Sequence, residues 1–169
     1  MKLDVSDKSK KDTFVSIFQV LKSCTSILHI MFNADALYIQ GMDKAHVCLF
    51  EIQLKSSWFQ EYEAPGPGEL ASVSVDSAIF YNVLSMNQDQ HSICICYGIE
   101  DEGEKIHINL LGKNGKGEYD KFFTIPLADS EHALLDIPSV DYDAEFTIHC
   151  KKIGDIISQL LILDRKSVV

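Results

Sequence analysis

Apolar residues fall at helical spacing in three segments of the chain, and short runs rich in β-branched and aromatic residues lie between them. The first helical pattern has apolar side chains at i, i+3, i+4 and i+7, which are Phe14, Ile17, Phe18 and Leu21. It follows a basic leader at residues 8–11, so Asp12 or Thr13 is the expected N-cap. These positions predict an amphipathic first helix.

The strand and helix patterns then occur in a repeated order. Strands are predicted after the first helix at residues 26–32, 36–39, 46–54 and 58–62. A new cycle begins with a strand at 71–75 and a short helix that Asp76 caps and that buries Phe80, Val83 and Leu84. Further strands are predicted at 91–97, 105–111 and 118–125. A helix followed by about four strands, twice over, predicts an α+β fold with two antiparallel sheets and both helices on one face.

Residues 126–169 have a different character. The segment 126–138 is a polar and leucine-containing connector, and a strand is predicted at 144–150. A third amphipathic helix is predicted at 151–163, with its inward positions at Ile153, Ile156, Ile157 and Leu160. We therefore divide the chain into a first domain at 1–125, a connecting loop at 126–138 and the incomplete beginning of a second domain at 139–169. A lone strand and helix cannot close a core, so we expect the sequence to continue beyond Val169.

Composition indicates a folded protein with reduced thiols. The chain has 169 residues, of which 46% are hydrophobic and 24% charged. Its five cysteines are an odd number, which is typical of a reducing, intracellular compartment. Cys94 and Cys96 should lie on one face of a strand as structural thiols, because no second cysteine or histidine pair with zinc spacing accompanies them. No apolar run approaches the roughly 18 residues that span a bilayer, so no membrane association is expected.

Candidate catalytic groups are sparse, which disfavours an enzyme. None of the six histidines is paired with an evident serine or cysteine motif. Residues 112–117 are rich in glycine and lysine, but they lack the Gly-Lys-Ser/Thr order and lead into a strand, so we interpret them as a hairpin turn. Residues 64–68 contain two prolines and two glycines and are a loop. We predict no catalytic residue, cofactor or metal.

The net charge of −10 excludes one way of binding nucleic acid but leaves another open. A protein that holds DNA by affinity is normally basic, because the binding energy comes from phosphate contacts. A protein that encircles DNA needs only weak backbone contacts, and an acidic exterior suppresses other contacts.

Four segments carry a family resemblance. Residues 40–49 read Gln-Gly-Met-Asp-Lys-Ala-His-Val-Cys-Leu, which closely resembles the Q-S-M-D-x-x-H-V-x-L run of eukaryotic-type sliding clamps. Residues 59–62 are similar to the family's F-x-x-Y, residues 125–129 to the entry of its connecting loop, and residues 135–138 to the L-x-I-P that closes that loop. These motifs follow the family's order, and together they resemble the proliferating cell nuclear antigen family.

The resemblance implies a ring of three subunits around double-stranded DNA, in which helices line the hole and sheets form the outer wall. It implies a homotrimer when full length, and docking of DNA polymerase, clamp loader, nuclease and ligase through short peptides. Such a protein acts in the nucleus, or in the cytoplasm if its source is viral or prokaryotic. The implied docking positions are Met42, His46, Val47, Leu49, Leu127, Leu134, Leu135 and Pro138. Alternatively, Met42 and Val47 belong only to the core. Pro126 departs from the family pattern at the loop's entry.

Two further surfaces are implied. The strand before the connecting loop is the family's unpaired edge, which contacts a neighbouring subunit at Tyr119, Phe122, Phe123 and Thr124, and the complementary strand is expected beyond Val169. The DNA-facing positions are Lys8, Lys11, Lys22, Asn82, Ser85 and Lys152. At Ser16, Asn82, Ser85, Asp155 and Ser158 the residues are uncharged or acidic where the family usually has Lys or Arg. This depletion favours a second hypothesis, a checkpoint-ring subunit or an interaction scaffold that does not load on DNA. The intact segment from Met42 to Val47 opposes it, so our prediction is a DNA sliding clamp, a processivity factor.

Overall fold

The computed structural model describes residues 1–64, 71–98, 105–112, 119–130, 134–136, 141 and 143–164. The chain forms two compact units, Met1–Leu135 and Asp136–Val169. The first unit therefore includes the connecting segment as far as Leu135. Apart from Ala64 and Gly112, the turns predicted at 64–68 and 112–117 lie outside the described residues, as does Pro138.

The first unit repeats one order of elements, a strand, a helix and then further strands. The first repeat consists of β1 (Lys2–Val5), α1 (Lys8–Cys24), β2 (Ile27–Phe32), β3 (Ala36–Met42), β4 (Leu49–Lys55), the 3-10 turn η1 (Ser56–Trp58) and β5 (Glu61–Glu63). The second consists of β6 (Ala71–Asp76), α2 (Ser77–Ser85), β7 (His91–Tyr97), β8 (Lys105–Gly112) and β9 (Lys121–Pro126). The predicted duplication is thus present, with a strand preceding each helix.

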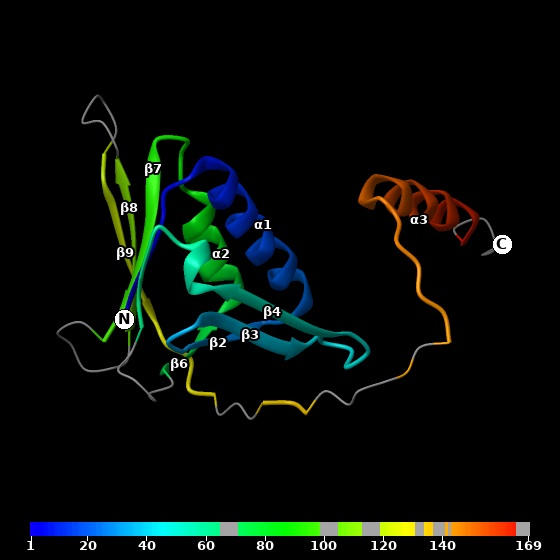
Figure 1. Cartoon of the computed structure of the whole chain (residues 1–169), viewed down its shortest axis with the longest axis horizontal. Helices are drawn as coiled ribbons and strands as arrows, with labels where there is room; N and C mark the ends of the chain where they lie inside the picture. Colours follow the sequence, from blue (N-terminus) through cyan, green and yellow to red (C-terminus); the bar gives the residue numbers. More distant parts are fainter. Residues whose placement is uncertain are drawn as a thin grey trace. The chain divides into compact units, whose positions relative to one another are not determined.

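Each sheet combines strands of both repeats. The five-stranded sheet has the order β5-β1-β7-β8-β9, and the four-stranded sheet has the order β4-β3-β2-β6. Every neighbouring pair is antiparallel. Figure 1 shows α1 and α2 side by side, next to the strands of both sheets. This arrangement confirms the predicted α+β fold.

Aromatic side chains join the helices inside the core. The rings of Phe14 and Phe18 on α1 are 4.9 Å apart, and Phe18 lies 4.8 Å from Phe80 on α2. Alternating strand residues such as Ile93 and Ile95 point into the same core and are almost fully buried. Val83 and Leu84 are buried as predicted.

The start of the chain differs from its prediction in two ways. Asp7, and not Asp12 or Thr13, caps α1, because the Asp7 carboxylate accepts a hydrogen bond from the backbone N–H of Lys10 at 2.9 Å. The basic residues 8–11 are therefore the first turn of the helix. The residues before them form β1, which the sequence analysis missed because four residues give too short a pattern.

The second unit also differs from its prediction. No strand forms among the described residues of 144–150, and Cys150 already begins α3 (Cys150–Asp164). A strand needs a paired neighbour, and the described part of the second unit supplies none. The predicted inward positions Ile156, Ile157 and Leu160 are 44–57% exposed, because no described residue of this unit covers them. None of the helices in the described part of the chain is long and apolar enough to cross a membrane.

Candidate functional site

A surface cleft of about 410 Å³ lies where the end of α1, strand β3 and the connecting segment meet. Its lining residues are Thr25, Ser26, Ile27, His29, Gly41, Met42, Asp43, Lys44, His46 and Leu135. The cleft therefore brings together three of the predicted docking residues, Met42, His46 and Leu135. Leu135 is far from the other two in sequence, and it is 95 positions from Gln40, the β3 residue that it contacts.

The turn between β3 and β4 forms one rim of the cleft, and Asp43 organises it. The Asp43 carboxylate accepts hydrogen bonds from the backbone N–H groups of Val47 and Cys48, both at 2.8 Å. These two bonds hold the pKa of Asp43 below its ordinary value of 3.8. His46 adopts a left-handed conformation with φ of 56°, which turns the chain sharply before Val47.

The other rim is fixed by Gln40, a residue whose role the sequence analysis did not identify. The Gln40 side chain is 2% exposed. Its Nε2 donates to the carbonyl of Leu135 at 2.9 Å, and its Oε1 accepts from the N–H of Leu135 at 2.8 Å. The buried amide thus imitates a neighbouring strand and clasps the connecting segment to β3. Gln40 lies in the motif at 40–49, but the motif alone did not reveal its partner.

The first part of the connecting segment runs along β6, the edge of the four-stranded sheet. The N–H of Ala128 donates to the carbonyl of Ser74 at 2.7 Å, and the Ser74 hydroxyl donates to the carbonyl of Ser130 at 3.2 Å. His29 Nδ1 lies 2.8 Å from the same hydroxyl. The segment therefore crosses from β9 in one sheet to the edge of the other and is held there.

Four further predicted docking residues do not line the cleft, namely Val47, Leu49, Leu127 and Leu134, and Pro138 lies outside the described residues. Val47 is 86% exposed at the tip of the Asp43 turn, which contradicts the alternative that it belongs only to the core. Leu49 and Leu134 are also exposed, whereas Leu127 is half-buried against the hydrophobic core. Of the predicted set, Met42 is half-buried and is the apolar side chain best placed to meet a ligand.

Gly41 is among the residues that line the cleft, and the Phe50 ring packs closely against it. A Cβ added to Gly41 would lie 2.7 Å from Cζ of Phe50, its cross-strand neighbour on β4.

The predicted subunit-contact strand lies at an edge, as expected. β9 is the last strand of the five-stranded sheet, with one side paired to β8. Phe122 is 69% and Tyr119 85% exposed, and Thr124 is exposed as well. Phe123 points the other way and packs against the core. The exposed side chains, and not Phe123, are therefore available to a neighbouring molecule.

The predicted DNA-facing residues have different environments. The prediction is wrong for Lys11, which is 1% exposed and donates its Nζ protons to the carbonyls of Gln88, Asp89 and His91. Lys8 is exposed but lies 2.6 Å from the Asp89 carboxylate. Lys22 lies 4.5 Å from the Tyr81 ring centroid. Asn82 and Ser85 are exposed on α2, and Lys152 is exposed on α3 in the second unit.

The cysteines outside these surfaces include one close pair. Cys94 and Cys96 on β7 lie on one face with their sulfur atoms 3.6 Å apart. Burial, followed by the neighbouring Cys96, raises the pKa of Cys94 to about 12, so its thiol stays protonated at neutral pH. In the described part of the chain, no three His, Cys, Asp or Glu side chains come together in an arrangement suited to a metal ion.

The chain is similar to known proteins in sequence and in fold. A family model described as proliferating cell nuclear antigen, N-terminal domain, matches residues 9–132. A DNA polymerase sliding clamp of Methanobrevibacter smithii is 25% identical over 165 residues, covering 98% of this chain and 62% of the relative. A probable DNA polymerase sliding clamp 2 of Paramecium bursaria Chlorella virus 1 is 27% identical, covering 82% of this chain and 47% of the relative. The chain thus spans less than two thirds of the length of these relatives.

Solved structures show the same fold. The PCNA of Thermococcus kodakaraensis superposes with a TM-score of 0.69 at 19% identity, covering 82% of this chain and 51% of that one. A PCNA2-PCNA3 complex from Sulfolobus tokodaii gives a TM-score of 0.68 at 24% identity, covering 85% of this chain and 52% of that one. With most of its residues matched by the family model and its fold shared with solved members, the chain belongs to the proliferating cell nuclear antigen family.

Proposed function

We propose that this chain is the front part of a DNA sliding clamp, a non-enzymatic ring subunit that encircles duplex DNA and carries replication proteins. The observation that carries the proposal is the cleft between the Asp43 turn and the connecting segment, which Gln40 clasps at Leu135. The family membership and the clamp names of the relatives support the same conclusion. No catalytic step is part of this function.

The cleft suits a short peptide with a hydrophobic plug. Met42 offers a flexible thioether that adapts to aromatic or aliphatic plugs. The connecting segment adds main-chain groups along which an extended peptide could pair. We assign the cleft to peptides of DNA polymerase, clamp loader, nuclease and ligase, with Val47, Leu49 and Leu134 as surrounding contacts. We also assign a docking contact to Pro138, which lies outside the described residues.

Replacement of Met42 and Leu135 by alanine should abolish peptide binding and leave the fold intact. Both side chains line the cleft, whereas Val20 on α1 does not and is 63% exposed, so Val20→Ala is the control. Binding would be measured by fluorescence anisotropy with a labelled polymerase peptide that carries a hydrophobic plug, and folding by circular dichroism. We expect at least about a 10-fold loss of affinity in the double variant, as for removal of a buried anchor. Unchanged affinity in the double variant would refute the docking site.

Retention on closed-circular DNA tests whether the protein forms a ring around the duplex. A clamp is retained on closed-circular DNA and lost when the circle is cut, whereas a scaffold or a checkpoint-type subunit that does not load shows no such difference. The native mass of the assembly separates a homotrimer, which we propose, from a heteromer of the kind named in the Sulfolobus complex. Action on DNA would place the protein inside the cell, and in the nucleus of a eukaryotic source.

A further inference from the structure

The cleft between the Asp43 turn and the connecting segment carries a lysine whose charge the described protein does not use. Lys44 lines this cleft, and its side chain is exposed. Its backbone N–H donates to the carbonyl of Cys24 at 3.0 Å, which ties the residue to the end of α1. Within the described residues, no hydrogen bond or ion pair engages the Lys44 ammonium. Lys44 is therefore fixed at its backbone and free at its charged end.

Two described carboxylates adjoin this cleft, and backbone N–H groups engage both of them. Asp43 accepts two hydrogen bonds from its own turn, both at 2.8 Å. Asp76 pairs in register with the lining residue Ile27, and its carboxylate accepts a backbone hydrogen bond at 2.8 Å as the N-cap of α2. Neither carboxylate forms an ion pair with Lys44. A ligand at Lys44 thus meets an ammonium group that no protein carboxylate binds.

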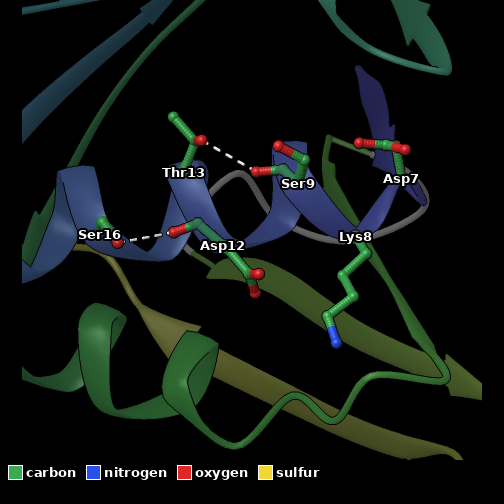
Figure 2. A pocket seen from close by; sticks show the side chains of 6 residues that line it. All are labelled: Asp7, Lys8, Ser9, Asp12, Thr13 and Ser16. Atoms are coloured by element: carbon green, nitrogen blue, oxygen red, sulfur yellow. Dashed lines mark hydrogen bonds between the residues drawn. The ribbon is translucent and has the colours of Figure 1, made fainter.

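A hollow at the start of α1 has the opposite arrangement (Figure 2). The residues that line it are Asp7, Lys8, Ser9, Asp12, Thr13 and Ser16. The ammonium of its lysine, Lys8, lies 2.6 Å from the Asp89 carboxylate. A negatively charged ligand in this hollow would have to compete with an existing ion pair, whereas a ligand at Lys44 would not.

The position of Lys44 relates its charge to the apolar part of the cleft. Lys44 is two residues beyond Met42 in the chain, and both residues line the cleft. A peptide that places a hydrophobic plug against Met42 therefore brings its neighbouring side chains to Lys44. The chain has a net charge of −10, so its overall field repels an acidic peptide and a local cation is needed to accept a carboxylate.

We propose that Lys44 selects partner peptides that carry an aspartate or glutamate side chain beside the hydrophobic plug. The proposal rests on the proposed function, in which this cleft binds a peptide, and it adds the charge that the peptide must have. Position 44 is one that the family-like run at 40–49 leaves open, so the selection comes from a residue particular to this chain. The carboxylate of the peptide and the Lys44 ammonium form an ion pair at the rim of the cleft.

The test compares pairs of peptides that differ in one charge. A labelled polymerase peptide with a hydrophobic plug is made with glutamate or with glutamine at each position beside the plug, and fluorescence anisotropy measures its binding. Lys44→Met removes the charge and keeps an unbranched side chain. Lys55→Met is the matched control, because Lys55 is exposed on β4 and does not line the cleft. Circular dichroism verifies that both variants are folded.

At low salt, the unaltered chain should bind the glutamate peptide about 2- to 5-fold more tightly than the glutamine peptide at one or more positions, as for an exposed ion pair. Lys44→Met should lose this preference, and Lys55→Met should keep it. Salt at about 1 M should remove the preference by screening. Lys44→Glu should reverse the preference, so that a peptide with lysine at the same position binds more tightly than the glutamate peptide.

Two results would overturn the role of Lys44. One is equal binding of the glutamate and glutamine peptides at every position. The other is a preference for glutamate that persists in Lys44→Met. If His46→Gln removes such a persistent preference, the selecting residue is His46, which also lines the cleft.

The docking site and the role of Lys44 fail in different measurements. Peptide binding that Met42→Ala with Leu135→Ala leaves unchanged refutes the docking site itself. Peptide binding that this double variant abolishes, but that shows no preference between glutamate and glutamine, keeps the docking site and refutes only the selection by Lys44.

Discussion

The four lysines of α1 have different environments. Lys8, Lys10 and Lys22 contact groups at the surface, whereas Lys11 extends into the interior and meets three backbone carbonyls that follow α2. The Lys11 ammonium has three protons and finds one acceptor for each. The buried charge is therefore satisfied, and it joins the start of α1 to the segment between α2 and β7.

Replacement of Lys11 by methionine should lower the free energy of unfolding by about 2–3 kcal/mol. Methionine keeps the apolar stem but leaves the carbonyls of Gln88, Asp89 and His91 without that donor in a buried site. Lys8→Met removes an exposed ion pair and should change the free energy by less than about 1 kcal/mol. Urea unfolding measures both values. Equal effects of the two replacements would contradict the structural role of Lys11.

At the scale of elements, the cleft depends on a turn and a clasp. The turn between β3 and β4 is held by one carboxylate, and the connecting segment is held by one amide. Each fixes one rim independently, because Asp43 binds backbone groups within its own turn and Gln40 binds a residue distant in sequence. Gln40 and Asp43 both belong to the family-like run at 40–49, so two residues of that run hold the two rims of the cleft.

The hydrogen-bonded structure of this turn should be lost at low pH, when the Asp43 carboxylate becomes protonated. Because the folded-state pKa of Asp43 is lowered, its carboxylate stabilises the turn fully above the ordinary value of 3.8. The stabilisation is lost as the pH falls through the lowered pKa. NMR titration of Asp43 and of the Val47 and Cys48 amides should give one common curve with its midpoint below 3.8.

Two variants sharpen the measurement on this turn. In Asp43→Asn the turn amides should no longer respond to pH in this range, and in Asp43→Ala they should lose protection from hydrogen exchange at every pH. A midpoint at or above 3.8 in the unaltered chain would show that the two backbone bonds do not hold the turn.

At the scale of the whole molecule, the outer side of β9 at the end of the five-stranded sheet is the surface that bears on assembly. Among the described residues the strand pairs with β8 alone, and its exposed side chains include Phe122. An edge of this kind binds further strands unless a partner covers it. In the proposed ring, the edge of one subunit is covered by a neighbouring subunit.

Phe122→Lys should therefore weaken subunit association by about 10-fold or more, because it places a charge at the contact that an aromatic residue fills. Val20→Lys is the matched control, since Val20 is 63% exposed on α1, away from this edge. Sedimentation or native mass spectrometry over a range of protein concentrations measures the change. If both variants associate as the unaltered protein does, β9 is not the contact strand.

Much of the fold could be predicted from the sequence, because the period of apolar residues is a local property. The helix that Asp76 caps and the strand β7 follow directly from their own residues. The strand predicted at 144–150 was wrong because strand formation depends on a partner, and a run of β-favouring residues does not say whether one is present. The strand β1 was missed for the opposite reason, since its four residues gain their order from β5 and β7 on either side.

The sequence by itself determined the repeated order of helices and strands, the motif at 40–49 and the net charge of −10. The tertiary structure alone decided that Lys11 lies inside, that Gln40 holds Leu135 and that Met42, His46 and Leu135 share one cleft. The physical reason is range: side-chain period and capping act within a few residues, whereas burial and long-range hydrogen bonds depend on segments that folding alone brings together.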